Sequence, residues 1–297
     1  MTSSLAQQVI LITGASAGIG ATLAQQLAQQ YSGVRLVLAA RSVDKLEQVA
    51  TQCRQLGADA LTVPTNMTET AQIEALAHTA LEKFGRVDAL INNAGYGQMG
   101  PVELIQPEVI RRQLEVNVVG VITLTQALIP AMRSQGGGRI INLSSIAGQV
   151  AFPFSGIYNA SKFALEGVSD ALRMELAPFN IQVSLIEPGP VQTEFFDVAR
   201  QQAEQALSVS HETPYQPAIE KLEEVAEQMS SQAWSAEQVA TVIIKALSDR
   251  HPRSRYVAAT YGRPLLLLLK FLPTAWVDRL WQRTYKIDLI TQAWQQK

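Results

Sequence analysis

The chain has little of what several classes of protein need. It contains a single cysteine, Cys53, so no disulfide can form within it. Its three histidines are scattered and show no metal-ligand spacing, so we expect no metal site. Basic and acidic residues nearly balance at a net charge of -2, which gives no reason to expect a nucleic-acid partner.

Long hydrophobic runs are also missing. Residues 1–7 are polar, and the apolar run Val9–Ile12 that follows is too short for a secretory signal peptide. The late run Leu265–Leu269 is far below the ~20 apolar residues that a membrane-spanning helix needs. We therefore expect a cytoplasmic protein that does not cross a membrane.

What the sequence does contain is a regular alternation of short apolar runs and amphipathic stretches. The apolar runs predict strands at 8–13, 34–40, 59–64, 87–91, 138–143, 181–187 and 254–258. The amphipathic stretches predict helices near 18–30, 42–56, 69–84, 107–133, 156–178 and 235–249. Such an alternation predicts an α/β fold of the Rossmann type, a doubly wound parallel sheet of about seven strands with helices on both faces.

Two segments interrupt the alternation, although no repeat or Gly/Ser linker divides the chain. Residues 194–230 form an acidic, helical insertion with eight acids against two basic residues. Residues 259–297 form a C-terminal helical extension broken by prolines. We expect a single domain over residues 1–297. At the helix ends, Ser42 is placed to cap the second helix, and Pro107 is placed in a first turn.

A glycine cluster follows the first predicted strand and opens the first predicted helix. The stretch Thr13–Gly20 reads TGASAGIG, with the spacing G-x-x-x-G-x-G. Glycine lets a chain turn tightly and lets its backbone approach a pyrophosphate, and the helix start offers free N–H groups to the phosphates. The cluster therefore predicts a dinucleotide site that includes Gly14, Ser16, Gly18, Ile19 and Gly20.

The end of the second predicted strand bears on the choice of cofactor. An NAD-binding site usually has an acid there, about 20 residues after the glycines, which holds the ribose 2′-hydroxyl. Here that position is Ala40, and Arg41 follows it. A guanidinium group suits a 2′-phosphate through its charge and its forked donors. The sequence therefore predicts NADP(H) as the cofactor, held in part by Arg41.

Tyr158 and Lys162 are four residues apart in a predicted helix, so they share one helix face. A tyrosine is a poor acid or base at neutral pH, because its reference pKa is about 10. A nearby ammonium group favours the phenolate and lowers that pKa. A hydroxyl from another segment can then hold the substrate oxygen as charge develops on it.

Taken together, these motifs resemble the short-chain dehydrogenase/reductase family of the ordinary short type. The resemblance covers roughly residues 8–193, and the segment from Tyr158 onward is similar to the hydroxysteroid and retinol dehydrogenase branch. It rests on several motifs in the same order along the chain: Thr13–Gly20, Asn92–Gly95, Asn117, Ser145, Tyr158, Lys162, and Pro188-Gly189 before Thr193.

The resemblance implies a role for each matching position. Tyr158 would be the general acid/base, and Lys162 would lower its pKa and hold the nicotinamide ribose. Ser145, rather than Ser144, would stabilise the substrate oxygen, and Asn117 would hold a water in a proton relay. The resemblance also implies that further residues contact the cofactor, with Asn92 bracing the sheet instead: Asn66, Asn93, Ala94, Gly95, Pro188, Gly189, Val191 and Thr193.

The loop between Ser145 and Tyr158 is apolar, and the resemblance implies that it walls the substrate pocket, with 194–230 as its lid. Ile146, Phe152 and Phe154 would then contact substrate beside the catalytic residues. An apolar wall favours a lipophilic ketone or alcohol. Alternatively, the two phenylalanines only pack the loop.

Three other questions remain open on the sequence alone. The segment from Lys245 to Lys286 has nine basic residues against two acids and is rich in Leu and Trp. This part of the C-terminal extension could lie on an anionic membrane, or could instead cover the active site or a neighbouring subunit. The resemblance implies a homodimer or homotetramer. Besides an NADP(H)-dependent oxidoreductase, the sequence allows a catalytically silent NADP(H)-sensing protein and an epimerase or dehydratase.

Overall fold

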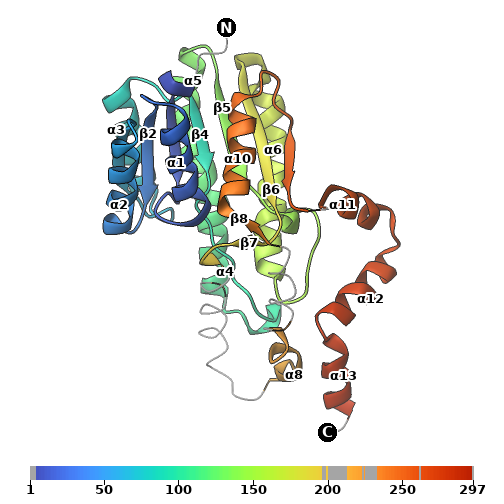
Figure 1. Cartoon of the computed structure of the whole chain (residues 1–297). Coiled ribbons are helices and arrows are strands. Elements are labelled where there is room, and N and C mark those ends of the chain that lie inside the picture. Colours follow the sequence, from blue (N-terminus) through green and yellow to red (C-terminus); the bar gives the residue numbers. More distant parts are fainter. Residues whose placement is uncertain are drawn as a thin grey trace.

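A parallel sheet forms the centre of the computed structural model, which describes residues 5–195, 199, 213–222, 224, 233–260 and 262–295 (Figure 1). Its strands lie in the order β3-β2-β1-β4-β5-β6-β9, and every neighbouring pair is parallel. The strands are β1 (Val9–Thr13), β2 (Arg35–Ala40), β3 (Asp59–Pro64), β4 (Ala89–Asn92), β5 (Gly138–Leu143), β6 (Ile181–Pro188) and β9 (Arg255–Ala258). The predicted seven-stranded, Rossmann-type parallel sheet is confirmed.

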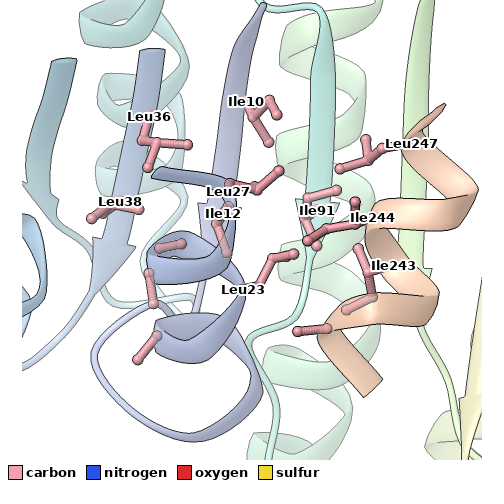
Figure 2. Packing of buried hydrophobic residues seen from close by; sticks show 14 of the residues in the cluster. Ile10, Ile12, Leu23, Leu27, Leu36, Leu38, Ile91, Ile243, Ile244 and Leu247 are labelled. Atoms are coloured by element: carbon pink, nitrogen blue, oxygen red, sulfur yellow. The ribbon is translucent and has the colours of Figure 1, made fainter. Parts of the chain in front are cut away.

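Helices cover both faces of this sheet. One face carries α1 (Gly18–Gln30), α2 (Val43–Gln55) and α10 (Ala236–Ser248). The other face carries α3 (Thr70–Phe84), α5 (Gly120–Ser134) and α6 (Gly156–Leu176). Figure 2 shows how Leu23 and Leu27 of α1 and the apolar side chains of α10 meet the strands. The helices are therefore held by apolar burial against the sheet.

Side chains of each strand alternate between these two layers. In β1, Ile10 and Ile12 face α1 and α10, whereas Val9 and Leu11 face α3 and α5. All four are fully buried. A strand buried on both faces reads as a continuous apolar run, which explains why the strand bounds could be predicted closely. The single cysteine, Cys53 of α2, is also fully buried in this core.

A continuous helix runs from Pro107 to Ser134 and includes α4 (Pro107–Leu114), a π-helical turn (Glu115–Val119) and α5. By length and composition alone this helix could cross a membrane. About a third of the residues in its most apolar stretch are buried inside the protein. Its Leu124 and Leu128 pack on the sheet as part of the core. As predicted, Pro107 lies in its first turn.

Local details differ from the sequence prediction at three places. Ser42 precedes α2 as expected, but its side chain makes no capping hydrogen bond; only its carbonyl accepts, from Leu46. A second, two-stranded sheet of β7 (Val191–Gln192) and β8 (Trp234–Ser235) was not predicted, because two-residue strands leave no pattern. Ser235 and Gln238 form an unpredicted capping box at the start of α10.

The C-terminal helices lie beside the sheet rather than on it. They are α11 (Gly262–Phe271), α12 (Thr274–Thr284) and α13 (Ile287–Gln295), and they extend from the edge at β9 toward the short helix α8 (Gln216–Ile219) (Figure 1). The predicted lid segment 194–230 falls mostly outside the described residues, apart from α8 and its neighbours.

Candidate active site

Most of the predicted cofactor residues follow the carboxyl ends of strands in the sheet. The strand order reverses between β1 and β4, and a crevice for a ligand is expected at such a switch point. The glycine cluster follows β1, Arg41 follows β2, Asn66 follows β3, Asn93–Gly95 follow β4, and Pro188–Thr193 end and follow β6. The fold therefore brings together segments spread over 180 residues of chain.

The glycine loop after β1 has a backbone that only glycine adopts easily. Gly14 and Gly18 have φ values of 67° and 54°, in the left-handed region. A Cβ atom on Gly20 would lie 2.6 Å from Nδ2 of Asn93 and would also collide with the carbonyl of Gly14. The loop is therefore a tight cradle before the N-terminus of α1, as a pyrophosphate site requires.

Two polar side chains fasten this loop to the strand beside it. Nδ2 of Asn93 donates to the carbonyls of Thr13 (2.9 Å) and Gly14 (3.1 Å). In return, Oγ1 of Thr13 accepts from the backbone N–H groups of Asn93 and Ala94, both at 3.0 Å. Asn93 therefore holds the cradle in shape, a contribution that the sequence did not predict for it.

The segment after β6 closes the cradle from the other side. A Cβ atom on Gly18 would lie 3.3 Å from Cγ2 of Thr193, so Thr193 lies over the glycine loop. The N–H of Gly189 donates to the carbonyl of Ala258 in β9 (3.2 Å), which fixes the turn. This arrangement is suitable for a ligand held between the two segments.

Arg41 and Asn66 lie where the adenosine end of a dinucleotide would be held. Arg41 is exposed directly after β2. Burial raises the pKa of Tyr96, and the charges of Arg112 and Arg41 act against that shift. Oδ1 of Asn66 accepts a hydrogen bond from the backbone N–H of Thr68 (3.2 Å). Arg112 of α4 is a second basic residue on this side that the sequence did not single out.

Tyr158 and Lys162 lie in the first two turns of α6, at the carboxyl ends of β5 and β6. Both are nearly fully buried, at 9% and 7% exposure. Burial raises the pKa of Tyr158 to about 12, and its hydrogen bond with Ser145 acts in the opposite direction. The phenol is therefore protonated at neutral pH and can donate a proton.

The ammonium group of Lys162 lies beside Tyr158, with Nζ 5.7 Å from the centre of the ring. Nζ donates to the carbonyl of Leu143 at the end of β5 (2.7 Å). Burial lowers the pKa of Lys162 to about 8, while the charge of Glu166, one helical turn away, acts against this shift. A cation with a lowered pKa can exchange protons near neutral pH.

Ser145, and not its neighbour Ser144, lies against the catalytic tyrosine. Its Oγ accepts from the N–H of Ala147 (3.1 Å), lies 3.3 Å from the carbonyl of Pro188, and hydrogen-bonds with Tyr158. The Ser144 side chain instead points toward Gly148 and Glu166. The hydroxyl of Ser145 can therefore share a substrate oxygen with the hydroxyl of Tyr158.

Asn117 lies in the π-helical turn, a feature that often marks functional sites. Its side chain bonds both backbone groups of Tyr96: Oδ1 accepts from the N–H (3.2 Å) and Nδ2 donates to the carbonyl (3.0 Å). A Cβ atom on Gly95 would meet Oδ1 of Asn117 at 3.1 Å and Nζ of Lys162 at 3.8 Å. Asn117 and Lys162 thus both lie beside Gly95, which suits the predicted relay.

The predicted substrate residues begin beside Ser145 and lead to an aromatic cluster. Ile146 opens the short helix Ile146–Gly148 and is half-buried. The ring of Phe152 lies 4.8 Å, edge-on, from the ring of Trp281. Phe154 has a φ of 60°, which is strained for a large side chain, and its ring contacts Tyr285. The two phenylalanines therefore pack the loop against the C-terminal helices.

A partly buried group of charged residues lies behind the catalytic helix and was not predicted. Arg255 of β9 pairs with Glu166 (2.9 Å), Asp170 (2.7 Å) and Glu187 (3.2 Å). Gln149 of the substrate loop donates to Glu187 (2.6 Å). Burial and the charge of Glu166 raise the pKa of Glu187 to about 7. In the sequence these acids look like ordinary surface residues, so only the fold reveals the group.

Comparison with known proteins agrees with this geometry. The model of the family described as short chain dehydrogenase matches residues 8–204. The chain belongs to the short-chain dehydrogenase/reductase family. Human (Homo sapiens) 17-beta-hydroxysteroid dehydrogenase type 1 is 36% identical over 269 residues, which cover 88% of this chain and 80% of that protein.

Solved structures of the family are similar over most of the chain. A short-chain dehydrogenase/reductase from Burkholderia phymatum in complex with NAD has a TM-score of 0.77 and 31% identity, covering 88% of this chain and 92% of its own. A metagenomic short-chain oxidoreductase in complex with NADP has a TM-score of 0.67 and 29% identity, covering 84% and 96%. The chain is therefore a dehydrogenase/reductase whose family uses a nicotinamide dinucleotide.

The side chains of this site can perform the proton half of such a reaction. When bound, the nicotinamide ring supplies or accepts the hydride. The phenol of Tyr158 donates a proton to the substrate oxygen in reduction and removes it in oxidation. Ser145 holds the same oxygen as charge changes on it. The predicted lowering of the Tyr158 pKa by Lys162 is not seen, because burial dominates. The Lys162 ammonium group lies near Asn117 and can pass the proton onward.

Proposed function

We propose that this dehydrogenase/reductase uses NADP(H) and interconverts a lipophilic ketone or aldehyde and the corresponding alcohol. The observation that carries the cofactor assignment is the end of β2, where Ala40 and Arg41 replace the acid that holds a ribose 2′-hydroxyl. The charge of Arg112, which also acts on Tyr96, adds a second cation on that side of the cleft. A cation and no acid at the strand end favour a 2′-phosphate.

The test is a titration of NADPH and NADH against the wild-type protein and Arg41→Ala. We expect NADPH to bind at least tenfold more tightly, a gap of about 1.4 kcal/mol, and Arg41→Ala to remove most of that gap. Arg250→Ala is the matched control, because Arg250 is exposed beside Gly138, at the opposite ends of the strands. Equal or tighter binding of NADH by the wild-type protein would refute the assignment.

A lipophilic substrate is supported by the apolar surroundings of the site. The ring of Phe195 lies 5.6 Å from the ring of Tyr158. Beyond it, Phe152 and Phe154 join an aromatic cluster with Trp281 and Tyr285. The name of the human relative, a hydroxysteroid dehydrogenase, points in the same direction.

A panel of steroid, long-chain and sugar-like ketones tests this part of the proposal. We expect NADPH to be consumed in proportion to product with the apolar ketones. Turnover of the sugar-like ketones alone would contradict a lipophilic substrate. An epimerase would return its cofactor unchanged, and a silent sensor would bind NADPH without turnover, so the same assay separates these alternatives.

We further propose that the protein is a cytoplasmic homodimer or homotetramer that associates through α5 and α6. Phe163 and Met174 of α6 are 45% and 64% exposed and would be covered by a partner in such an assembly. Light scattering after size-exclusion chromatography should give two or four times the chain mass of 32.4 kDa. A monomer at all accessible concentrations would contradict this.

A further inference from the structure

The helices of the C-terminal extension have two faces with different surroundings. The inner face of α12 and α13 packs on the substrate loop: Trp281 and Tyr285 contact Phe152, and Ile287 and Ile290 join the same cluster. These side chains therefore cover the loop. The outer face of α11 and α12 is different, because many of its large side chains have no cover in the described structure.

On α11 the uncovered residues form a stripe. Pro264, Leu267, Leu268 and Phe271 are spaced i, i+3, i+4 and i+7, which places them on one side of a helix. All four are exposed, and Leu267 and Phe271 reach 60% and 82%. Leu269, which lies off this stripe, is buried against the protein. The exposed side of α11 is therefore the apolar one, the reverse of an ordinary surface helix.

On α12 the exposed face mixes apolar and basic side chains. Trp276 and Leu280, one turn apart, are 64% and 46% exposed. Arg279 and Arg283 are exposed on the same side of the helix, three and seven residues after Trp276. A helix face that combines Trp, Leu and Arg suits the boundary between water and lipid.

The net charge of this region is positive. Between residues 262 and 295 there are five basic residues, Arg263, Lys270, Arg279, Arg283 and Lys286, against Asp278 and Asp288. None of the ion pairs found among the described residues involves any of the five. These cations remain available to an external anionic surface.

We propose that the outer face of α11 and α12 binds the surface of an anionic phospholipid bilayer. The apolar stripe of α11 would enter the headgroup region, and the basic residues would contact anionic lipid. With ten and eleven residues, the two helices are far shorter than the ~20 residues needed to span the hydrocarbon core. The contact is therefore peripheral.

A second copy of the chain fits this face less well. A symmetric pair would bring the same patch of both copies together, so that Arg279 and Arg283 of one copy would face those of the other. Like charges in close contact are repulsive. Anionic lipid instead complements both the charge and the apolar stripe.

Flotation of the full-length protein with vesicles tests the proposal. Vesicles of phosphatidylcholine alone are compared with vesicles that also contain phosphatidylglycerol, at low and high salt. We expect binding to the anionic vesicles only, weakened by salt because the basic contacts are screened. Failure to bind anionic vesicles, or equal binding to the neutral ones, would overturn the proposal.

Two double variants identify the surface. Leu267→Gln with Phe271→Gln removes apolar contact, and Arg279→Gln with Arg283→Gln removes charge; each should lower the partition coefficient at least tenfold. Leu56→Gln and Arg250→Gln, at exposed positions on the body of the protein, are the controls and should bind like the wild type. Circular dichroism confirms that each variant is folded. Wild-type binding by both double variants would overturn the proposal. It would also be overturned if the wild-type protein did not float with vesicles but self-associated, and the double variants lost that self-association.

The readout needs neither cofactor nor substrate, so it is independent of the proposed function. If both proposals hold, the substrate loop lies under helices whose other face is on the membrane. A lipophilic substrate would then reach the site from the bilayer; this consequence alone rests on the proposed substrate class.

Discussion

The cofactor side and the substrate side of the site are built in different ways. The glycine cradle is held by backbone contacts and by Thr13 and Asn93, at the ends of the central strands. The substrate side is held by aromatic contacts between a loop and helices outside the sheet. In the glycine cradle the backbone segments lie so close together that almost no substitution fits, whereas aromatic packing tolerates many substitutions. The first side therefore suits an unchanging cofactor, and the second can adapt to different substrates.

The largest effect is expected where the two sides meet, at Tyr158. Tyr158→Phe removes the proton donor and should lower kcat by about 10²–10⁴-fold. Titration should show NADPH binding within a few-fold of wild type, because the cradle is untouched. A variant that keeps more than a tenth of the activity would show that another group moves the proton.

A substitution in the cradle should affect the cofactor side alone. The new methyl group of Gly20→Ala would collide with Gly14 and Asn93, and cofactor binding should weaken by roughly 30-fold, about 2 kcal/mol. Gly167→Ala is the matched control, because nothing lies within 4 Å of its added carbon. That control should bind cofactor normally. Equal effects of the two variants would contradict the tight cradle.

The reverse pattern is expected on the substrate side. Trp281→Ala removes the edge contact with Phe152 and should raise KM for a lipophilic ketone roughly tenfold, about 1.4 kcal/mol, with cofactor affinity unchanged. Trp294→Ala, at a 65% exposed position on α13, is the control. If Trp281→Ala also weakened cofactor binding, the two sides would not be independent.

The smallest effect concerns stability and comes from the charged group behind both sides. The pKa of Glu187 is raised from 4.5 to about 7, so the folded state binds the proton more tightly than the unfolded chain. The resulting stabilisation is present below pH 4.5 and is lost as the pH rises through 7. Glu187→Gln should remove about 1 kcal/mol of this pH dependence, measured by urea unfolding at pH 5 and 8. Glu82→Gln, at an exposed position, should leave it unchanged; a wild-type slope in Glu187→Gln would contradict the burial argument.

The same division decides how much could be predicted from sequence. The inner strands were predictable because burial on both faces produces continuous apolar runs, as in β1. The glycine cradle and the Tyr158–Lys162 pair were predictable because their chemistry requires fixed residue types at fixed local spacing. The structure brings these residues together at the carboxyl ends of the strands.

What could not be predicted depends on contacts between distant segments. The π-helical turn at Glu115–Val119 continues the helical pattern of residues on both sides, so no residue type in the sequence indicates it. The charged group around Arg255 brings together residues of one helix and two strands. In the sequence its acidic residues look like ordinary solvent-exposed ones. The sequence also left two alternatives for the C-terminal extension. Its inner face does cover the substrate loop, while its outer face carries the exposed apolar stripe.

The buried position of Cys53 has a practical consequence. Burial raises the pKa of its thiol to about 11, so almost no reactive thiolate is present at neutral pH. A maleimide dye should therefore not react with Cys53. It should react only with a cysteine introduced at an exposed position, such as Phe271→Cys. An environment-sensitive fluorophore can thus be attached to α11 without first removing Cys53, which leaves the core of the protein intact.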